Sequence, residues 1–179
     1  MRMAKTIYLA GGCFWGIEHL MKALPGVVAT TCGYANGTGE QDADYRTVCT
    51  GRTGFRETVR VEFDAAATSA DALLYAFFQV IEPEAVNRQA HDVGTQYQAG
   101  VYWTPGDAEV EADVHRVMEC ERARTAAFAV EEKPLENFFA AEEYHQDYLD
   151  KNPYGYCHVP FATIKRLAST PFDEGYYRS

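Results

Sequence analysis

The six residues 11–16, GGCFWG, stand where a short apolar run meets a segment of helical periodicity. The preceding run, residues 6–10, predicts a buried strand. Apolar residues then recur at helical spacing up to Leu24, and Pro25-Gly26 predicts the end of that helix. The sequence therefore places Cys13 where a strand turns into a helix, after two glycines that allow the backbone to turn sharply.

The position of Cys13 has a chemical consequence. No Ser, Thr, Asp or Asn at positions 10–13 caps the helix, so its first N–H groups are free for another partner. The positive end of a helix favours a thiolate and can lower a cysteine pKa from about 8.5 to roughly 3.5–7.5. We therefore expect Cys13 to be a reactive thiolate, the alternative being a small buried core residue.

Two aromatic residues follow the cysteine directly. Only one of two adjacent helical residues can point into the core, so Phe14 and Trp15 cannot both be buried in it. The other ring is left near the thiol, in the first turn of the helix. We expect it to line an apolar pocket beside Cys13.

Composition limits the class of protein. The chain has 179 residues, 47% of them hydrophobic and 13% aromatic, which is typical of one globular domain. Its formal net charge of −10 argues against nucleic acid and against an anionic membrane as partners. No apolar run approaches the roughly 20 residues of a membrane-spanning helix.

The cysteines and the first residues of the chain indicate the cellular compartment. Five cysteines without paired spacing make a structural disulfide framework improbable and favour a reducing environment. The first residues lead into the predicted strand without the apolar region of a signal peptide. We therefore expect a cytoplasmic protein.

Periodicity along the rest of the chain predicts an α+β fold. Helices and strands alternate irregularly, which favours antiparallel strand pairs over a regular βαβ array. Strands are predicted at 27–34, 55–64, 98–103 and 127–133, and helices at 69–81, 107–127 and 142–151. Glycine-rich or polar loops occupy residues 33–51 and 87–97.

Strand 55–64 carries a candidate acid. Its polar and apolar residues alternate, and the same parity places Glu57 on the apolar face. Desolvation raises the pKa of a buried carboxyl and keeps it protonated near neutral pH, as a general acid requires. The alternative is that the sheet ends before Glu57 and leaves it solvated.

Several segments, in order, resemble the peptide methionine sulfoxide reductase A family. The first is GCFWG at 12–16 followed by Glu18, and the second is GFRE at 54–57, which fits the Gly-x-x-Glu segment of the family's acid. Asp92 followed by GTQY at 94–97 resembles the family's second active-site loop. YHQ at 144–146 with NPYGYC at 152–157 resembles its C-terminal part. The resemblance spans roughly residues 6–158.

The resemblance implies a fold and a domain organisation. The family fold is a two-layer α/β sandwich around a mixed, partly antiparallel sheet with a ferredoxin-like core. On this basis residues 1–158 form a single catalytic reductase domain. Residues 159–179 form a C-terminal tail that packs on it or extends from it.

The resemblance also implies an activity, the thiol-dependent reduction of methionine S-sulfoxide, free or in proteins. Cys13 attacks the sulfoxide sulfur, Glu57 protonates the oxygen, and Cys13 is left as a sulfenic acid. Cys157 then forms a disulfide with Cys13, which thioredoxin or a similar dithiol reduces. No metal or organic cofactor is required. The expected substrate-binding residues are Phe14, Trp15, Tyr45, Asp92 and Tyr97.

Three alternatives stay open at this point. Cys49, on the predicted active-site loop beside Tyr45, is the alternative to Cys157 as the cysteine that resolves the sulfenic acid. Cys13 could be the nucleophile of a hydrolase or acyltransferase, with His145 or His158 as its base. The chain could also be a non-catalytic domain with a metal site of Cys157, His158 and His145, although their spacing matches no standard zinc pattern.

Overall fold

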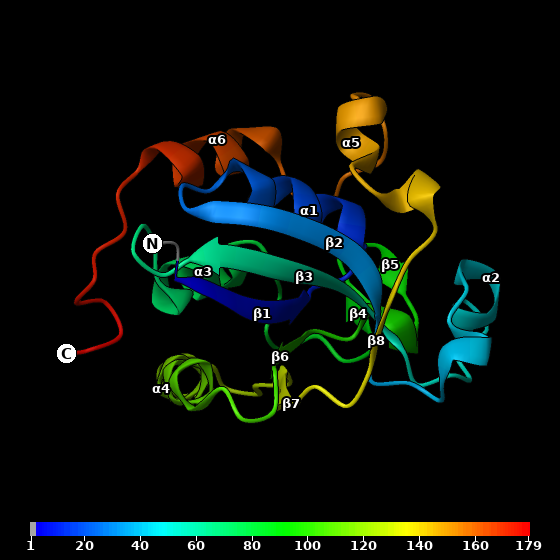
Figure 1. Ribbon diagram of the computed structural model, residues 1–179, viewed down its shortest axis with the longest axis horizontal. Coiled ribbons are helices and arrows are strands. Elements are labelled where there is room, and N and C mark those ends of the chain that lie inside the picture. The colour runs from blue at the N-terminus through cyan, green and yellow to red at the C-terminus, as the bar shows by residue number, and fades with distance from the viewer. Residues whose placement is uncertain (1–2) are drawn as a thin grey trace.

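The computed structural model describes residues 3–179 and contains a six-stranded sheet. Its strands are β1 (Ala4–Ala10), β2 (Val27–Ala35), β3 (Arg56–Asp64), β6 (Gly100–Trp103), β7 (Glu131–Pro134) and β8 (Phe138–Ala140). They lie in the order β7-β6-β1-β3-β2-β8 (Figure 1). All neighbours pair antiparallel except β6 and β7, which are parallel, so the sheet is mixed as predicted. A separate hairpin pairs β4 (Arg88–Gln89) with β5 (Asp92–Val93).

Four helices cover one face of the sheet. They are α1 (Phe14–Ala23), α3 (Ala70–Phe78), α4 (Ala108–Ala123) and α6 (Phe161–Ser169). Their buried side chains form one hydrophobic core with strand residues such as Ile7, Leu9, Val59 and Val61. A second, small cluster around Tyr8 and Tyr102 occupies the opposite face. Because strand side chains alternate between faces, this division produces two layers.

The connections define a ferredoxin-like core. The chain runs β1-α1-β2 and then β3-α3-β6, and the four strands of these units lie in the order β6-β1-β3-β2. The two strands of each unit are therefore not neighbours, and one strand of the other unit lies between them. The predicted α+β class and the ferredoxin-like core are both confirmed.

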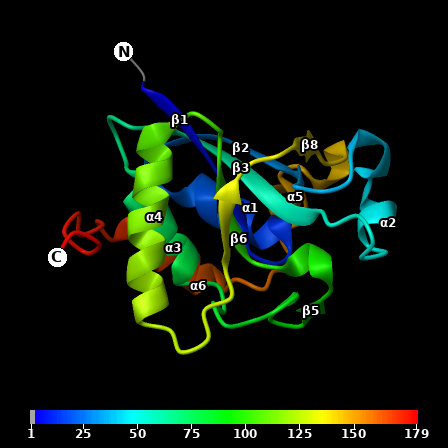
Figure 2. The same ribbon diagram turned by 90° about the horizontal axis from the view of Figure 1, so that it is seen from below.

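Several short elements gather beyond the end of β1, where α1 begins. They include α2 (Tyr45–Val48), the β4–β5 hairpin and α5 (Tyr148–Lys151). Figures 1 and 2 show them on one side of the molecule, with both chain ends on the other. Three 3-10 helices, Glu40–Asp42, Thr95–Tyr97 and Glu143–His145, complete the structure.

The start of α1 follows the sequence closely. Gly12 has φ of 85°, a left-handed conformation that favours glycine, and the helix begins at Phe14. The helical stripe of Phe14, Ile17, Leu20 and Met21 is buried. This stripe holds the helix against the sheet, and the helix start fixes where Cys13 lies.

The predicted helix at 142–151 is wrong as a continuous element. A 3-10 helix covers Glu143–His145 and α5 covers Tyr148–Lys151, because Asp147 between them has a left-handed backbone with φ of 54°. Tertiary bonds favour this break. The Gln146 side chain bonds the backbone N–H and C=O of Cys32, and the Asp147 N–H donates to Glu18.

The last twenty residues are ordered against the helices. They contain α6, and Tyr177 is 2% exposed within the main core. The Tyr177 hydroxyl donates to Glu121 on α4 over 2.6 Å. Ile164 and Leu167 bury the inner face of α6.

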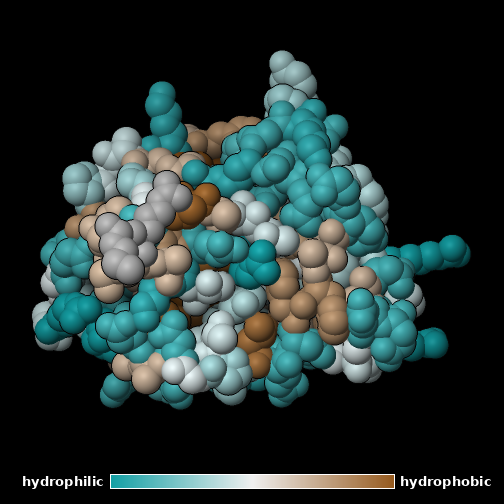
Figure 3. Space-filling model, in the orientation of Figure 1, coloured by the Kyte–Doolittle hydropathy of each residue, from teal (hydrophilic) through white to brown (hydrophobic). Residues whose placement is uncertain are grey.

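The face seen in Figure 1 is mostly hydrophilic, with hydrophobic side chains in small patches (Figure 3). This agrees with the high content of acidic residues. Within residues 3–179, none of the helices has the length and hydropathy needed to cross a membrane.

Candidate active site

Cys13 occupies the N-cap position of α1, and its side chain is 8% exposed. No side chain caps the helix there. The backbone N–H of Trp15, in the first turn, acts to lower the pKa of the Cys13 thiol. The helix start therefore faces the thiol, as the sequence predicts.

The predicted low pKa of Cys13 is wrong for the protein without substrate. Burial raises its pKa far above the usual value, and the neighbouring charges of Glu57 and Asp92 raise it further. The Trp15 N–H acts in the opposite direction and is outweighed. The resting sulfur is thus a thiol, because desolvation penalises a thiolate more than one helix end stabilises it.

Glu57 lies on the buried face of β3, as its parity predicts. It pairs opposite Tyr34 within the sheet and is 2% exposed, so the alternative of a solvated carboxylate is wrong. Its Oε1 accepts a hydrogen bond from the Phe14 N–H over 3.2 Å. Its Oε2 is buried without a hydrogen-bond partner among residues 3–179. Burial, assisted by the charge of Asp92, raises the pKa of Glu57 to about 8, although the Phe14 N–H opposes the shift.

A cavity of 80 Å³ joins these groups. It is formed by α1, α2, β3, the β5 loop and the segment after α5. Its lining residues are Cys13, Phe14, Trp15, Tyr45, Glu57, Asp92, Tyr97 and Tyr156. The structure therefore brings together every predicted site residue except Cys157.

The two aromatic residues after Cys13 are held by partners from the C-terminal part of the chain. Phe14 is 1% exposed, and its ring centroid lies 5.0 Å from that of His145. The Trp15 ring stacks on Tyr148 at 3.6 Å with an angle of 8° between planes. The Trp15 Nε1–H donates to His145 Nδ1 over 3.0 Å. These contacts fix an aromatic wall beside the thiol.

The hydroxyls of Tyr45 and Tyr97 are the neutral donors of the cavity. Burial raises the pKa of both, and the charge of Glu57 adds to the effect. Glu142 fixes the Tyr45 loop, because its Oε2 accepts the Tyr45 N–H at 3.0 Å and its Oε1 the Tyr34 hydroxyl at 2.7 Å. Both tyrosines therefore keep their protons at neutral pH and can donate to an oxygen in the cavity.

Tyr156 is a site residue that sequence reasoning missed. Its hydroxyl donates to Asp92 Oδ2 over 3.0 Å, and this bond connects the segment after α5 to β5. Burial and this bond raise the pKa of Tyr156 to about 12. Its position directly before Cys157 was the signal available in the sequence. Glu142, His145 and Tyr148 were missed as supports because their partners are distant in sequence.

Cys157 does not line the cavity, although the residue before it does. Its side chain is partly buried, and its sulfur donates to the Val159 carbonyl over 3.1 Å. Burial raises the pKa of Cys157, so its sulfur is also a thiol in the resting protein. Cys49 is exposed at the end of α2, and all five cysteines are free thiols.

The candidate bases of a hydrolase face other partners. His145 Nδ1 accepts from Trp15, and His158 Nε2 donates to the Gly11 carbonyl over 3.0 Å. Neither histidine lines the Cys13 cavity. Within residues 3–179, no group of three or more His, Cys, Asp or Glu side chains is arranged to hold a metal ion.

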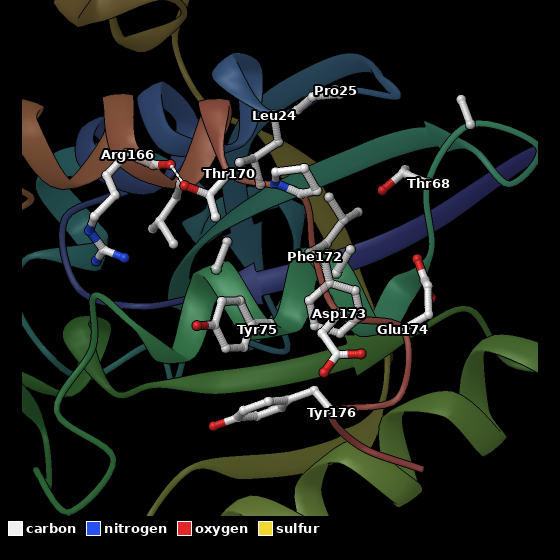
Figure 4. Close-up of a pocket in the computed structure, with 16 residues that line it drawn as sticks. Leu24, Pro25, Thr68, Tyr75, Arg166, Thr170, Phe172, Asp173, Glu174 and Tyr176 are labelled. Atoms are coloured by element: carbon white, nitrogen blue, oxygen red, sulfur yellow. Dashed lines mark hydrogen bonds between the residues drawn. The ribbon is translucent and has the colours of Figure 1, made fainter. Parts of the chain in front are cut away.

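A larger cavity of 340 Å³ lies elsewhere (Figure 4). It is bounded by the end of α1, α3, α6 and the tail, with Tyr75, Arg166 and Phe172 among its lining residues. It contains none of the predicted site residues and no cysteine or histidine. The predicted site residues other than Cys157 line the smaller, 80 Å³ cavity instead.

Fold and site together define the class of protein: an α+β enzyme with a buried thiol and a buried, protonated carboxyl in one aromatic cavity. The family model described as peptide methionine sulfoxide reductase matches residues 5–174. The peptide methionine sulfoxide reductase MsrA of Clostridium acetobutylicum is 43% identical over 166 residues, covering 90% of this chain and 99% of the relative.

Solved structures agree with the family match. Reduced Mxr1 from Saccharomyces cerevisiae superposes with a TM-score of 0.79 at 35% identity, covering 88% of this chain and 91% of that chain. Methionine sulfoxide reductase A of Corynebacterium diphtheriae gives 0.76 at 33% identity, with 88% and 83% covered. The chain belongs to the peptide methionine sulfoxide reductase family.

Proposed function

We propose that the protein reduces methionine S-sulfoxide, free or in proteins, to methionine by thiol chemistry. One observation carries this proposal: Cys13 and Glu57 line the same small cavity, and Glu57 Oε2 has no hydrogen-bond partner among residues 3–179. A sulfoxide needs a sulfur nucleophile for its sulfur and a proton donor for its oxygen. The cavity supplies both.

The cavity suits the end of a methionine sulfoxide side chain. The S-methyl group lies against the wall of Phe14 and Trp15, which would exclude a bulkier substituent. The sulfoxide oxygen faces Glu57 and the hydroxyls of Tyr45 and Tyr97. Its developing negative charge is stabilised there by neutral donors in a desolvated site.

Proton exchange between Glu57 and Cys13 reconciles the raised thiol pKa with nucleophilic attack. Glu57 gives its proton to the sulfoxide oxygen as the Cys13 sulfur bonds to the substrate sulfur, and the carboxylate receives the thiol proton. The substrate S–O bond and the new bond between the two sulfurs then break as the oxygen passes to the Cys13 sulfur. The products are methionine and a Cys13 sulfenic acid, so the sulfoxide is reduced and Cys13 oxidised.

Recycling uses a second cysteine. The Cys157 thiol condenses with the sulfenic acid, which forms a Cys13–Cys157 disulfide and releases water. Thioredoxin or a similar dithiol then reduces this disulfide. Yeast Mxr1 has been crystallised in complex with Trx2, which supports such a partner.

Location and cofactor use complete the proposal. The chemistry described needs only protein thiols and a carboxyl, so no metal or organic cofactor is assigned. Five free thiols fit a reducing compartment, and we propose a cytoplasmic enzyme. Residues 1–158 supply the proposed site residues, and we propose that the tail 159–179 supports them.

Turnover of the separated sulfoxide epimers tests the function. With dithiothreitol as reductant, the S epimer should yield methionine and the R epimer should not. Ester or amide hydrolysis dependent on Cys13, with neither epimer reduced, would instead favour the hydrolase alternative. Equal reduction of both epimers would contradict the arrangement of methyl and oxygen given above.

A further inference from the structure

We propose that His158 is a positioning residue that tethers the recycling cysteine to the turn bearing the nucleophile. His158 directly follows Cys157, and Gly11 lies two residues before Cys13. The His158 Nε2–H donates to the Gly11 carbonyl over 3.0 Å. One hydrogen bond thus joins the neighbourhoods of the two reacting sulfurs across 147 residues of sequence.

The His158 ring packs against Gly16, in space that a side chain at residue 16 would need. A Cβ at Gly16 would lie 3.1 Å from both Nδ1 and Cε1 of the ring, tighter than ordinary contact. A Cβ at Gly12 would lie 3.5 Å from Nε2. The ring therefore packs onto the first turn of α1 because residue 16 has no side chain. This assigns a role to the second glycine of the GCFWG motif.

The hydrogen bond to Gly11 defines the tautomer of the ring in the resting protein. A carbonyl can only accept, so Nε2 carries the proton and Nδ1 is the unprotonated nitrogen. Nδ1 is buried without a partner among residues 3–179, and it faces Gly16. The burial that lowers the pKa of His158 keeps the ring neutral. His158 is therefore suited to hold the chain in place.

The tether matters for the resolving step. Cys157 lies in residues 152–160, between the end of α5 and the start of α6, where the chain forms neither helix nor strand. A fixed point beside Cys157 limits how far its sulfur can move from Cys13 and raises its effective concentration at the sulfenic acid. The reaction is condensation of the sulfenic acid with the Cys157 thiol to a disulfide and water. This inference rests on the proposed function.

A matched pair of amides tests the tether. In His158→Gln the side-chain nitrogen reaches the place of Nε2 and keeps the donor, whereas the shorter His158→Asn cannot. One equivalent of methionine S-sulfoxide is mixed with each variant without reductant. Methionine release and Cys13–Cys157 disulfide formation are followed by rapid quench and mass spectrometry of non-reduced peptides.

We expect His158→Asn to release methionine at the wild-type rate but to form the disulfide about five- to tenfold more slowly, the effect of one lost hydrogen bond. His158→Gln should stay within about twofold of wild type on the same scale. Dimedone should trap more Cys13 sulfenic acid in the Asn variant, because the acid lives longer. His115→Gln, on the remote helix α4, controls for loss of a histidine and should change neither rate.

Several outcomes would overturn the tether. Wild-type disulfide rates in His158→Asn would show that the bond is not used. Equal slowing in the Asn and Gln variants would assign the effect to ring shape. Parallel loss of the methionine burst and the disulfide rate would show a general structural role. Absence of a burst in the wild-type protein would instead refute the proposed function itself.

Discussion

The backbone N–H of Phe14 donates to Glu57 Oε1 over 3.2 Å, so the acid is bonded to the residue that follows Cys13. This bond uses one of the free N–H groups at the start of α1 and occupies one carboxyl oxygen. The other oxygen, Oε2, has no partner within residues 3–179 and remains available to substrate. The bond therefore orients the acid relative to the thiol.

Replacing the acid should affect the chemical step more than binding. Glu57→Gln keeps an oxygen that can accept the Phe14 N–H but has no proton to donate. The single-turnover rate of methionine formation should fall by about 10²–10⁴-fold, the usual contribution of general acid catalysis. Substrate affinity should change less, because the acid acts on charge that develops in the transition state. An unchanged single-turnover rate would show that the proton comes from another group.

The single-turnover rate should also depend on pH in a defined direction. The Glu57 pKa is raised to about 8, so the acid is protonated at neutral pH and loses its proton above that value. The rate should therefore decrease above pH 8, and the decrease should approach about tenfold per pH unit. Glu57→Gln should lack this step in its profile. A wild-type profile flat from pH 6 to about pH 10 would contradict the assignment of Glu57 as the acid.

The same carboxyl should make stability depend on pH. Its pKa rises from 4.5 to about 8 on folding, so between these values the folded protein binds a proton that the unfolded chain has released. The contribution of Glu57 to stability should therefore be most favourable below the lower value and become less favourable as pH rises, approaching about 1.4 kcal/mol per unit of pH through the window. Urea unfolding at pH 5, 7 and 9 should show that the free energy of unfolding of Glu57→Gln increases relative to that of wild type as pH rises. A pH-independent difference between them would oppose this expectation.

Alkylation should report the buried state of the nucleophile. The exposed Cys49 should react with iodoacetamide near neutral pH before Cys13, which is 8% exposed and protonated. Cys32, with no exposure, should react last. Peptide mapping after timed quenching measures the order. Fastest labelling of Cys13 would show that its sulfur is more ionised than its burial indicates.

Removing the recycling cysteine should separate the two half-reactions. Cys157→Ser should give a full stoichiometric burst of methionine, since the proposed first step needs the Cys13 thiol and not that of Cys157, whereas Cys13→Ser should give none. Thioredoxin-supported turnover of Cys157→Ser should stall, and dithiothreitol should rescue part of it.

The alternative resolver is tested in the same way with Cys49→Ser, which serves as the matched control. Its turnover with thioredoxin should equal that of wild type, because Cys157 is the proposed resolving cysteine. A peptide map dominated by a Cys13–Cys49 disulfide, with Cys157→Ser still active, would reverse the two roles.

The sequence by itself determined the local framework of the site. Helical periodicity and the glycines before Cys13 located the start of α1, because both act through short-range backbone geometry. Strand parity located Glu57 on the buried face, because alternation along a strand is a local property. The ordered series of motifs indicated the family, which the comparisons then showed.

Only the tertiary structure decided the ionisation of Cys13 and the supports of the cavity. A thiol pKa sums the helix end, burial and distant charges, and the last two depend on how Glu57 and Asp92 pack around the sulfur. The hydrogen bonds of Asp147 with Glu18 and of His158 with Gly11 likewise join residues more than a hundred positions apart. Such contacts leave no periodic pattern in the chain, since they arise only when separate elements pack together.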